Sequence, residues 1–231
     1  LYAHCDGCGT HDHNTNGALI GNVKYHGKVP SARPLRMDAD PICGAAHTDK
    51  AYTESFIVDS DLNLKNVLVW LTNVNYQGEV TKDIAIIDQK GCVYSPHVLG
   101  VMKDQMVLIK NSDATLHNIH SMANVNDQFN FAMPKVVKEK KTSFNKVEEP
   151  FYIKCDVHPW MKSWVLVQDH PYFAVTDDKG NFKIENIPAG TYEVIAWQEK
   201  FKMTRAITKT IEIKDESETV QDFLFIKPEK K

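Results

Sequence analysis

The chain has 231 residues, with 27 lysines and arginines against 30 aspartates and glutamates, giving a formal net charge of −3. Acidic and basic residues are interspersed, which argues against a nucleic-acid-binding protein, because such proteins usually carry a basic excess or stripe. No apolar run approaches the roughly 20 residues of a membrane-spanning helix. The chain begins with Leu1 rather than Met, as expected of a mature chain that has lost a signal peptide, although a trimmed chain would begin in the same way.

Short runs of alternating β-branched and aromatic residues dominate the chain, and stretches with helical periodicity are scarce. They predict a first set of strands at residues 18–25, 55–59, 66–72, 106–110, 142–144, 151–155 and 163–168. A second set is predicted at residues 172–176, 182–184, 191–197, 208–213 and 220–226, separated by turn sequences such as 177–181 and 188–190. Many short strands with regular turns predict an all-β protein built from sandwiches or barrels.

Changes in pattern along the chain predict three parts. Residues 1–16 are polar, rich in Cys and His and without periodicity. Residues 17–168 are expected to form a first β domain, interrupted by a proline-containing, loop-like insertion at about 29–53. A fresh hairpin pattern begins near residue 169, so residues 169–231 are expected to form a second, smaller β-sandwich.

One constellation carries more functional information than the rest of the sequence. Cys155, His158 and Met161 share one short loop, and His117 follows a turn that leads into another strand. One thiolate, one thioether and two imidazoles are the ligands of a mononuclear copper electron-transfer site. His120 is a second candidate for the first imidazole. Zinc is the main rival metal, but structural zinc sites use Cys and His without Met, so Met161 favours copper.

The two segments His117-Asn118-Ile119-His120 and Cys155 to Met161 resemble the ligand loops of the cupredoxins, closest to the amicyanin and plastocyanin branch. The resemblance covers residues 107–167 well. It implies a Greek-key β-barrel or sandwich holding one type 1 copper through His117, Cys155, His158 and Met161, with His120 at a non-ligand position. The family commonly has Ser or Thr directly after the ligand Cys, bonded to the residue that is Asn118 here. Asp156 replaces it, which changes the surroundings of the thiolate.

The same resemblance implies where an electron would leave. In cupredoxins the exposed edge of the second His ligand, His158 here, is the electron exit. Pro159 and Trp160 would form an apolar rim around it, suited to brief docking of a redox protein partner. Core packing is the alternative role for Trp160.

If Cys155 is a ligand, four of the five cysteines remain: Cys5, Cys8, Cys43 and Cys92. An even remainder suits two disulfides in an oxidising compartment, and three pairings are open. We favour Cys43 with Cys92, which would pin the 29–53 insertion to the barrel; the alternative is buried free thiols.

The N-terminal segment offers a second candidate metal site, for zinc or copper. Its soft ligands are Cys5, Cys8, His11 and His13. The alternative is a disulfide-bonded or disordered tail whose histidines occur there by chance.

The C-terminal part, at about residues 171–227, resembles the carboxypeptidase-regulatory-like, or transthyretin-like, β-sandwich. Nothing in it suggests catalysis, since its acidic residues lie in turns and on alternating faces. The resemblance implies a docking, spacing or self-association module, and self-association could also use the N-terminal segment.

These observations predict a periplasmic or extracellular type 1 copper protein that transfers single electrons between redox partners. We expect no enzymatic activity, because four protein ligands would leave copper no open position. Two alternatives remain open. One is an extracellular structural or assembly subunit, able to form polymers, that keeps the cupredoxin fold. The other is a copper carrier that hands its metal on.

Overall fold

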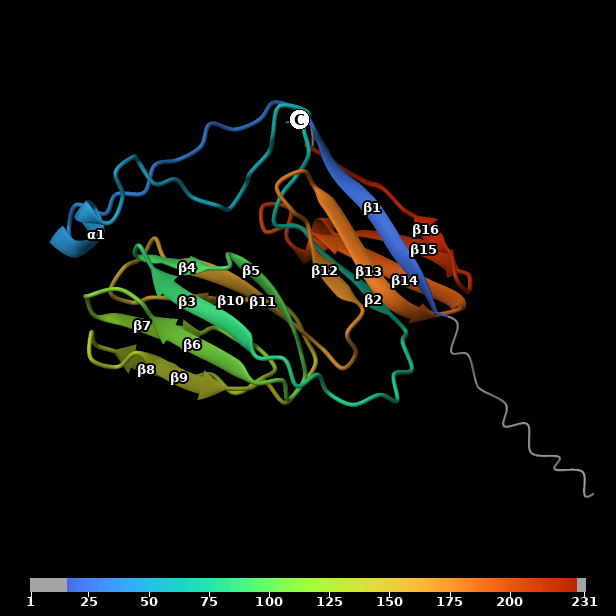
Figure 1. Ribbon diagram of the computed structural model, residues 1–231. Coiled ribbons are helices and arrows are strands. Elements are labelled where there is room, and N and C mark those ends of the chain that lie inside the picture. Colours follow the sequence, from blue (N-terminus) through green and yellow to red (C-terminus); the bar gives the residue numbers. More distant parts are fainter. Residues whose placement is uncertain (1–15, 228–231) are drawn as a thin grey trace, which may run out of the picture.

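A computed structural model describes residues 16–227, and it consists almost wholly of β-strands. Figure 1 shows two β units lying side by side, joined by long connections. The predicted all-β class with a second β unit is therefore confirmed. No helix among the described residues has the length and apolar character needed to cross a membrane.

The first unit packs two mixed sheets against each other. One has the order β5-β11-β10-β7-β8 and the other β4-β3-β6-β9. Their strands are β3 (Ala85–Lys90), β4 (Val93–Ser95), β5 (Val98–Met102), β6 (Val107–Asn111), β7 (His117–Ser121), β8 (Asn130–Met133), β9 (Glu139–Thr142), β10 (Glu148–Lys154) and β11 (Lys162–Gln168). Neighbouring strands are often distant in sequence, and β5 with β11 and β3 with β6 run parallel. The strands β3, β4, β5 and β8 were not predicted.

The second unit takes strands from both ends of the described chain. They are β1 (Asn16–His26), β2 (Leu68–Thr72), β12 (Phe173–Val175), β13 (Asn181–Pro188), β14 (Gly190–Trp197), β15 (Ile207–Ile213), β16 (Glu218–Val220) and β17 (Phe223–Ile226). One sheet has β1 between β13 and β16, with β17 also on β1, and the other has the order β12-β2-β14-β15. A short 3₁₀ helix, η1 (Met203–Arg205), precedes β15.

This pairing differs from the expected boundary, which placed residues 17–168 in the first domain. β1 pairs with β13, and β2 lies between β12 and β14, so both belong to the second unit. The reason is burial: Leu68 to Leu71 are at most 3% exposed, as expected of a central strand covered on both faces. The sequence pattern found both strands but could not tell which sheet they would join.

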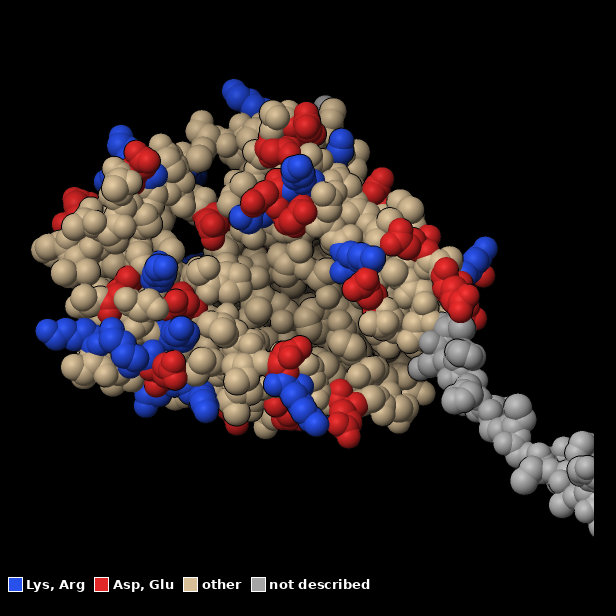
Figure 2. Space-filling view, viewed as in Figure 1, with Lys and Arg blue, Asp and Glu red and all other residues tan. Residues whose placement is uncertain are grey.

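Each unit has its own apolar core, and a third cluster joins them. Buried side chains between the units include Trp70 of β2, Val98 of β5, Leu166 of β11 and Trp197 of β14. On the face seen in Figure 2, Lys and Arg are mixed with Asp and Glu, and the middle, where the units meet, is uncharged. The two units are thus packed together by apolar contacts.

The 29–53 insertion leaves the second unit and arches over to one end of the first (Figure 1). It carries α1 (Pro41–Ala45), whose first backbone N–H groups are capped by the Asp40 carboxylate. The expected strand at 55–59 is reduced to an isolated bridge between Val58 and Leu64. This arch matters for function because it reaches the end of the first unit that bears His117 and Cys155.

A buried carboxylate at the start of β10 fastens the loop after β7. Glu148 is 4% exposed and accepts backbone N–H bonds from Asn124, Val125 and Asn126. Burial alone would raise the pKa of Glu148, but the hydrogen bond from the Asn126 side-chain amide, together with these backbone bonds, outweighs it and lowers that pKa.

We expect Glu148→Gln to lower the free energy of unfolding by about 1–3 kcal/mol, since charge-assisted hydrogen bonds are lost in a buried place. Because the folded pKa is depressed, the stabilisation is complete above the unfolded pKa of about 4.3 and is lost as pH falls through the folded value. Denaturant unfolding at several pH values should show that the difference in free energy of unfolding between the variant and wild type becomes smaller in acid. Glu149→Gln, at the exposed neighbour, is the control; equal losses in both variants would contradict this assignment.

Candidate metal centre

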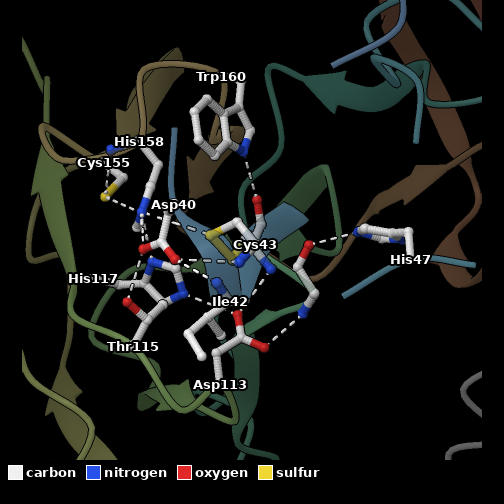
Figure 3. The surroundings of a disulfide bond; sticks show 12 residues. Asp40, Ile42, Cys43, His47, Asp113, Thr115, His117, Cys155, His158 and Trp160 are labelled. Atoms are coloured by element: carbon white, nitrogen blue, oxygen red, sulfur yellow. Dashed lines mark hydrogen bonds and ion pairs between the residues drawn. A yellow bond between two sulfur atoms is a disulfide. The ribbon is translucent and has the colours of Figure 1, made fainter. Parts of the chain in front are cut away.

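Three of the four predicted ligands converge at one end of the first unit. His117 opens β7, whereas Cys155 and His158 lie in the loop between β10 and β11. The two ring Nδ1 atoms are 2.9 Å apart, and Cys155 Sγ is 3.7 Å from His158 Nδ1. One ligand atom from each residue fits within 4.8 Å of the other two. Figure 3 shows the two rings and the thiol directed toward a common point.

The loop from Cys155 to Met161 is closed by its own hydrogen bonds. The backbone N–H of Cys155 donates to the Met161 carbonyl over 3.3 Å, and that of Met161 donates to the His158 carbonyl over 2.9 Å. The His158 N–H donates to the Cys155 sulfur over 3.4 Å. Met161 is 1% exposed and belongs to the same buried cluster as Cys155. The loop thus holds Met161, the fourth predicted ligand, in the same buried core as Cys155.

An aspartate holds the outer nitrogen of each histidine. His117 Nε2 lies 2.9 Å from the Asp113 carboxylate, and His158 Nε2 lies 3.1 Å from the Asp40 carboxylate. In each pair the Nε2–H donates to the acid, which leaves Nδ1 free to bind a metal ion. This is the usual arrangement of metal-ligating histidines, because the acid fixes both the tautomer and the ring orientation.

Both aspartates are in turn tied to a disulfide. Cys43 and Cys92 are bonded, which confirms the predicted pairing. Asp113 accepts the backbone N–H groups of Gly91 and Cys92, and Asp40 accepts that of Cys43. The disulfide therefore joins the arch to the first unit at the place where the two acids contact the histidines.

Sequence reasoning missed Asp40 and Asp113. Asp113 stands four residues before His117, and Asp40 stands directly before Pro41, the first residue of α1. The capping signal Asp-Pro was readable, but it predicts a helix start and not a histidine contact. Asp40 reaches His158 only because the arch folds over the first unit.

The charges within the cluster support thiolate chemistry. Burial would lower the pKa of His117, but hydrogen bonds to Asp113 and Cys155 outweigh it and raise that pKa to about 9. Burial would likewise raise the pKa of the Cys155 thiol, but the bond to His117 and backbone N–H groups lower it. A thiolate is the form of Cys that binds metals.

Asn118 connects the two ligand segments. Its side-chain oxygen accepts one hydrogen bond from the Cys155 thiol over 3.2 Å and another from the Asp156 backbone N–H over 2.7 Å. Its amide donates to the Asp156 carboxylate over 3.0 Å. Asp156 thus keeps a link to Asn118 where the cupredoxins commonly have Ser or Thr. The Asp156 carboxylate also binds His120, 3.0 Å away, so the second-ranked histidine lies outside the cluster.

The expected exposure of His158 was wrong. His158 is only 2% exposed. Asp40 and the Cys43 sulfur, which lies 3.6 Å from His158 Nε2, cover the Nε2 edge of its ring. Trp160 packs beside His158, with ring centroids 5.1 Å apart, and its indole N–H donates to the Cys92 carbonyl. Pro159 precedes it at the exposed tip of the loop. The family resemblance could not predict that His158 is covered, because the covering residues belong to the 29–53 insertion.

Two further groupings of metal-binding side chains, around Asp40 and around Asp113, each include a cysteine of the disulfide. A disulfide sulfur is not a thiolate, so neither grouping offers a second site. The N-terminal candidate site, made of Cys5, Cys8, His11 and His13, lies outside the described residues.

Comparison with known proteins gives two partial similarities. A Cu(I) form of a methionine-to-alanine variant of amicyanin is 21% identical and covers 43% of this chain and 98% of its own, with a TM-score of 0.34. An oxidised proline-to-glycine variant of amicyanin covers 50% of this chain and 94% of its own at 20% identity and a TM-score of 0.34. A copper-containing nitrite reductase from Thermus scotoductus is 19% identical over 42% of this chain and 25% of its own, with a TM-score of 0.33.

The second similarity concerns the end of the chain. Residues 150–221 match the family model of polysaccharide lyase family 4, domain II, a segment that runs from β10 to beyond β16. No curated protein was found to match the sequence. Neither similarity assigns a function to this chain.

We expect Asp113→Asn to weaken metal binding about 10- to 100-fold, because the amide cannot hold the His117 Nε2–H as the carboxylate does. Competition against a chelator of known affinity would measure the change. Asp127→Asn, at a side chain that is 93% exposed, should leave the affinity unchanged. An unaltered affinity in Asp113→Asn would show that the acid does not position the histidine.

Proposed function

We propose that this protein is an exported electron carrier that holds one copper ion in a mononuclear site formed by His117, Cys155, His158 and Met161. One observation carries the proposal. Two buried imidazole nitrogens and a buried thiol converge, and an acid holds the outer nitrogen of each ring. A buried set of two His and one Cys with a Met nearby suits copper electron-transfer sites.

When bound, copper would supply reversible one-electron exchange. The chain's own residues would hold the ligands in one geometry in both oxidation states. Asn118 positions the Cys155 sulfur, and the two acids position the rings. The side chains of His117, Cys155 and His158 are buried, which keeps water away from the site. Such rigid support would keep the rearrangement of the ligands small when an electron is exchanged.

Burial also supports the expectation that the protein is not an enzyme. A thiolate beside an imidazole could in principle serve as a catalytic nucleophile. Cys155, however, is 1% exposed and His117 is fully buried, so a substrate has no access to either. Four protein ligands would leave no open position for one on the metal.

The Cys43–Cys92 disulfide favours a periplasmic or extracellular location, because disulfides persist in oxidising compartments. The second β unit supports the reading of a docking, spacing or self-association module like the carboxypeptidase-regulatory-like sandwich. Redox partners would approach the end of the first unit that carries His158. The alternatives are an assembly subunit with a cupredoxin-like fold and a copper carrier.

We expect the purified full-length chain to bind one equivalent of copper in this site and to turn intensely blue when oxidised, through thiolate-to-copper charge transfer. Cys155→Ser should abolish the colour, and His117→Gln should abolish or greatly weaken it. His120→Gln is the matched control and should stay blue, because His120 binds Asp156 outside the cluster. Metal analysis and visible absorption spectra check each variant.

The same preparations separate the alternatives. An oxidised, copper-loaded protein that remains colourless would contradict the electron-carrier proposal and favour a structural role. Sedimentation showing only monomers would count against an assembly subunit. Rapid loss of copper to a weak chelator, without a reversible colour change on reduction, would favour a carrier.

A further inference from the structure

A recess lies between the arch and the second unit, directly over the covered metal centre. Its volume is about 890 Å³, within the range of small-molecule sites. One wall is the arch from Arg33 to Pro41, and the opposite wall includes Lys200, which follows β14. Its floor is the loop from Val157 to Trp160. Figure 2 shows a hollow beneath the arch, which Figure 1 identifies as the segment leading to α1.

The recess is strongly basic although the chain as a whole has a net charge of −3. Arg33, Arg36 and Lys200 line it, and all three are exposed. Neither arginine forms an ion pair with any residue between 16 and 227. Asp40 is the one acid in the lining, and its carboxylate is already bound to His158, Thr115 and the start of α1.

A second recess of about 480 Å³ continues the basic surface. It shares Arg33 and Lys200 with the first recess and adds Arg205 and Lys227. Five cations therefore follow one trough along the junction between the arch and the second unit. Lys200 is paired with Glu199 over 3.4 Å, whereas the other four form no ion pair with any residue between 16 and 227. Unpaired cations gathered in a concave place raise the local concentration of anions and favour their binding.

The lining of the first recess also supplies apolar contact beside this charge. Leu35, Pro41, Val157 and Pro159 line the first recess, and the Trp160 ring packs against His158. Arginine forks bind carboxylates in two-pronged fashion, and an indole face packs well on a flat ring. A ligand that satisfies both features needs two or more negative charges and an apolar portion.

The geometry points to a binding site for a small organic dianion, with its carboxylates on Arg33, Arg36 and Lys200 and its ring against Trp160. The recess is concave and its volume is that of a small-molecule site, which favours a small molecule over a protein surface. The site needs no metal, so it goes beyond the proposed electron transfer. An occupant would lie against the loop that holds His158, which itself lines the recess, and could act on the centre through that residue.

The test uses the metal-free full-length chain with its disulfide intact, and benzene-1,3-dicarboxylate as the probe. Calorimetry and quenching of Trp fluorescence measure binding. We expect saturable binding that weakens as salt is raised and is lost with the neutral diamide of the same shape. Lys200→Gln should weaken binding about two- to fivefold, and Arg33→Gln with Arg36→Gln should weaken it more.

Lys209→Gln, at an exposed lysine on β15 outside both recesses, is the control and should bind as wild type. The exposed positions of all four substitutions should leave the melting temperature unchanged. Equal affinity for the diacid and the diamide would overturn the proposal, as would full binding by the double arginine variant. Because no copper is present, these outcomes do not depend on whether the metal centre carries electrons.

Discussion

The centre depends on two carboxylate–imidazole hydrogen bonds, Asp113 to His117 and Asp40 to His158. Without them each ring could rotate or carry its proton on Nδ1. The Nδ1 atom would then not be free to bind a metal ion together with the other ligands. The two acids come from separate segments, one from a turn before β7 and one from the cap of α1. The Cys43–Cys92 disulfide joins α1 to the turn between β3 and β4, whose Gly91 and Cys92 N–H groups donate to Asp113. The cross-link therefore contributes to the site as well as to stability.

The second unit is coupled to the ligand loop through buried polar groups. Glu199, which follows β14, accepts the Trp164 indole N–H and lies 2.7 Å from His97 Nε2. His97 Nδ1 in turn contacts the carbonyl of Lys162, the first residue of β11 after the ligand loop. Burial would raise the pKa of Glu199, but the bond to His97 lowers it, as expected of an acid that remains charged in a buried network. The β11 end of the ligand loop is thus fixed by groups of both units.

The sequence predicted the local features of the molecule better than its long-range ones. Runs of β-branched and aromatic residues identified β1 and β2 as strands, and the spacing of Cys155, His158 and Met161 predicted the loop that holds them. Their sheet was not predictable, because strand alternation reports burial of a face but not the identity of the partner. Asp40 was missed for the same reason: its contact with His158 spans 118 residues and arises only from the path of the arch.

The arch also changes how a redox partner could reach the centre. In the family resemblance the edge of the second histidine is bare, whereas here Asp40 and Cys43 cover it. An approaching partner would meet Val157, which is 48% exposed, and Trp160, whose ring adjoins His158. The cover leaves His158 only 2% exposed, and the Asp40–His158 bond is part-buried. Under the proposed function, a redox partner would therefore approach the loop through its aromatic side, next to the Arg and Lys side chains that line the recess.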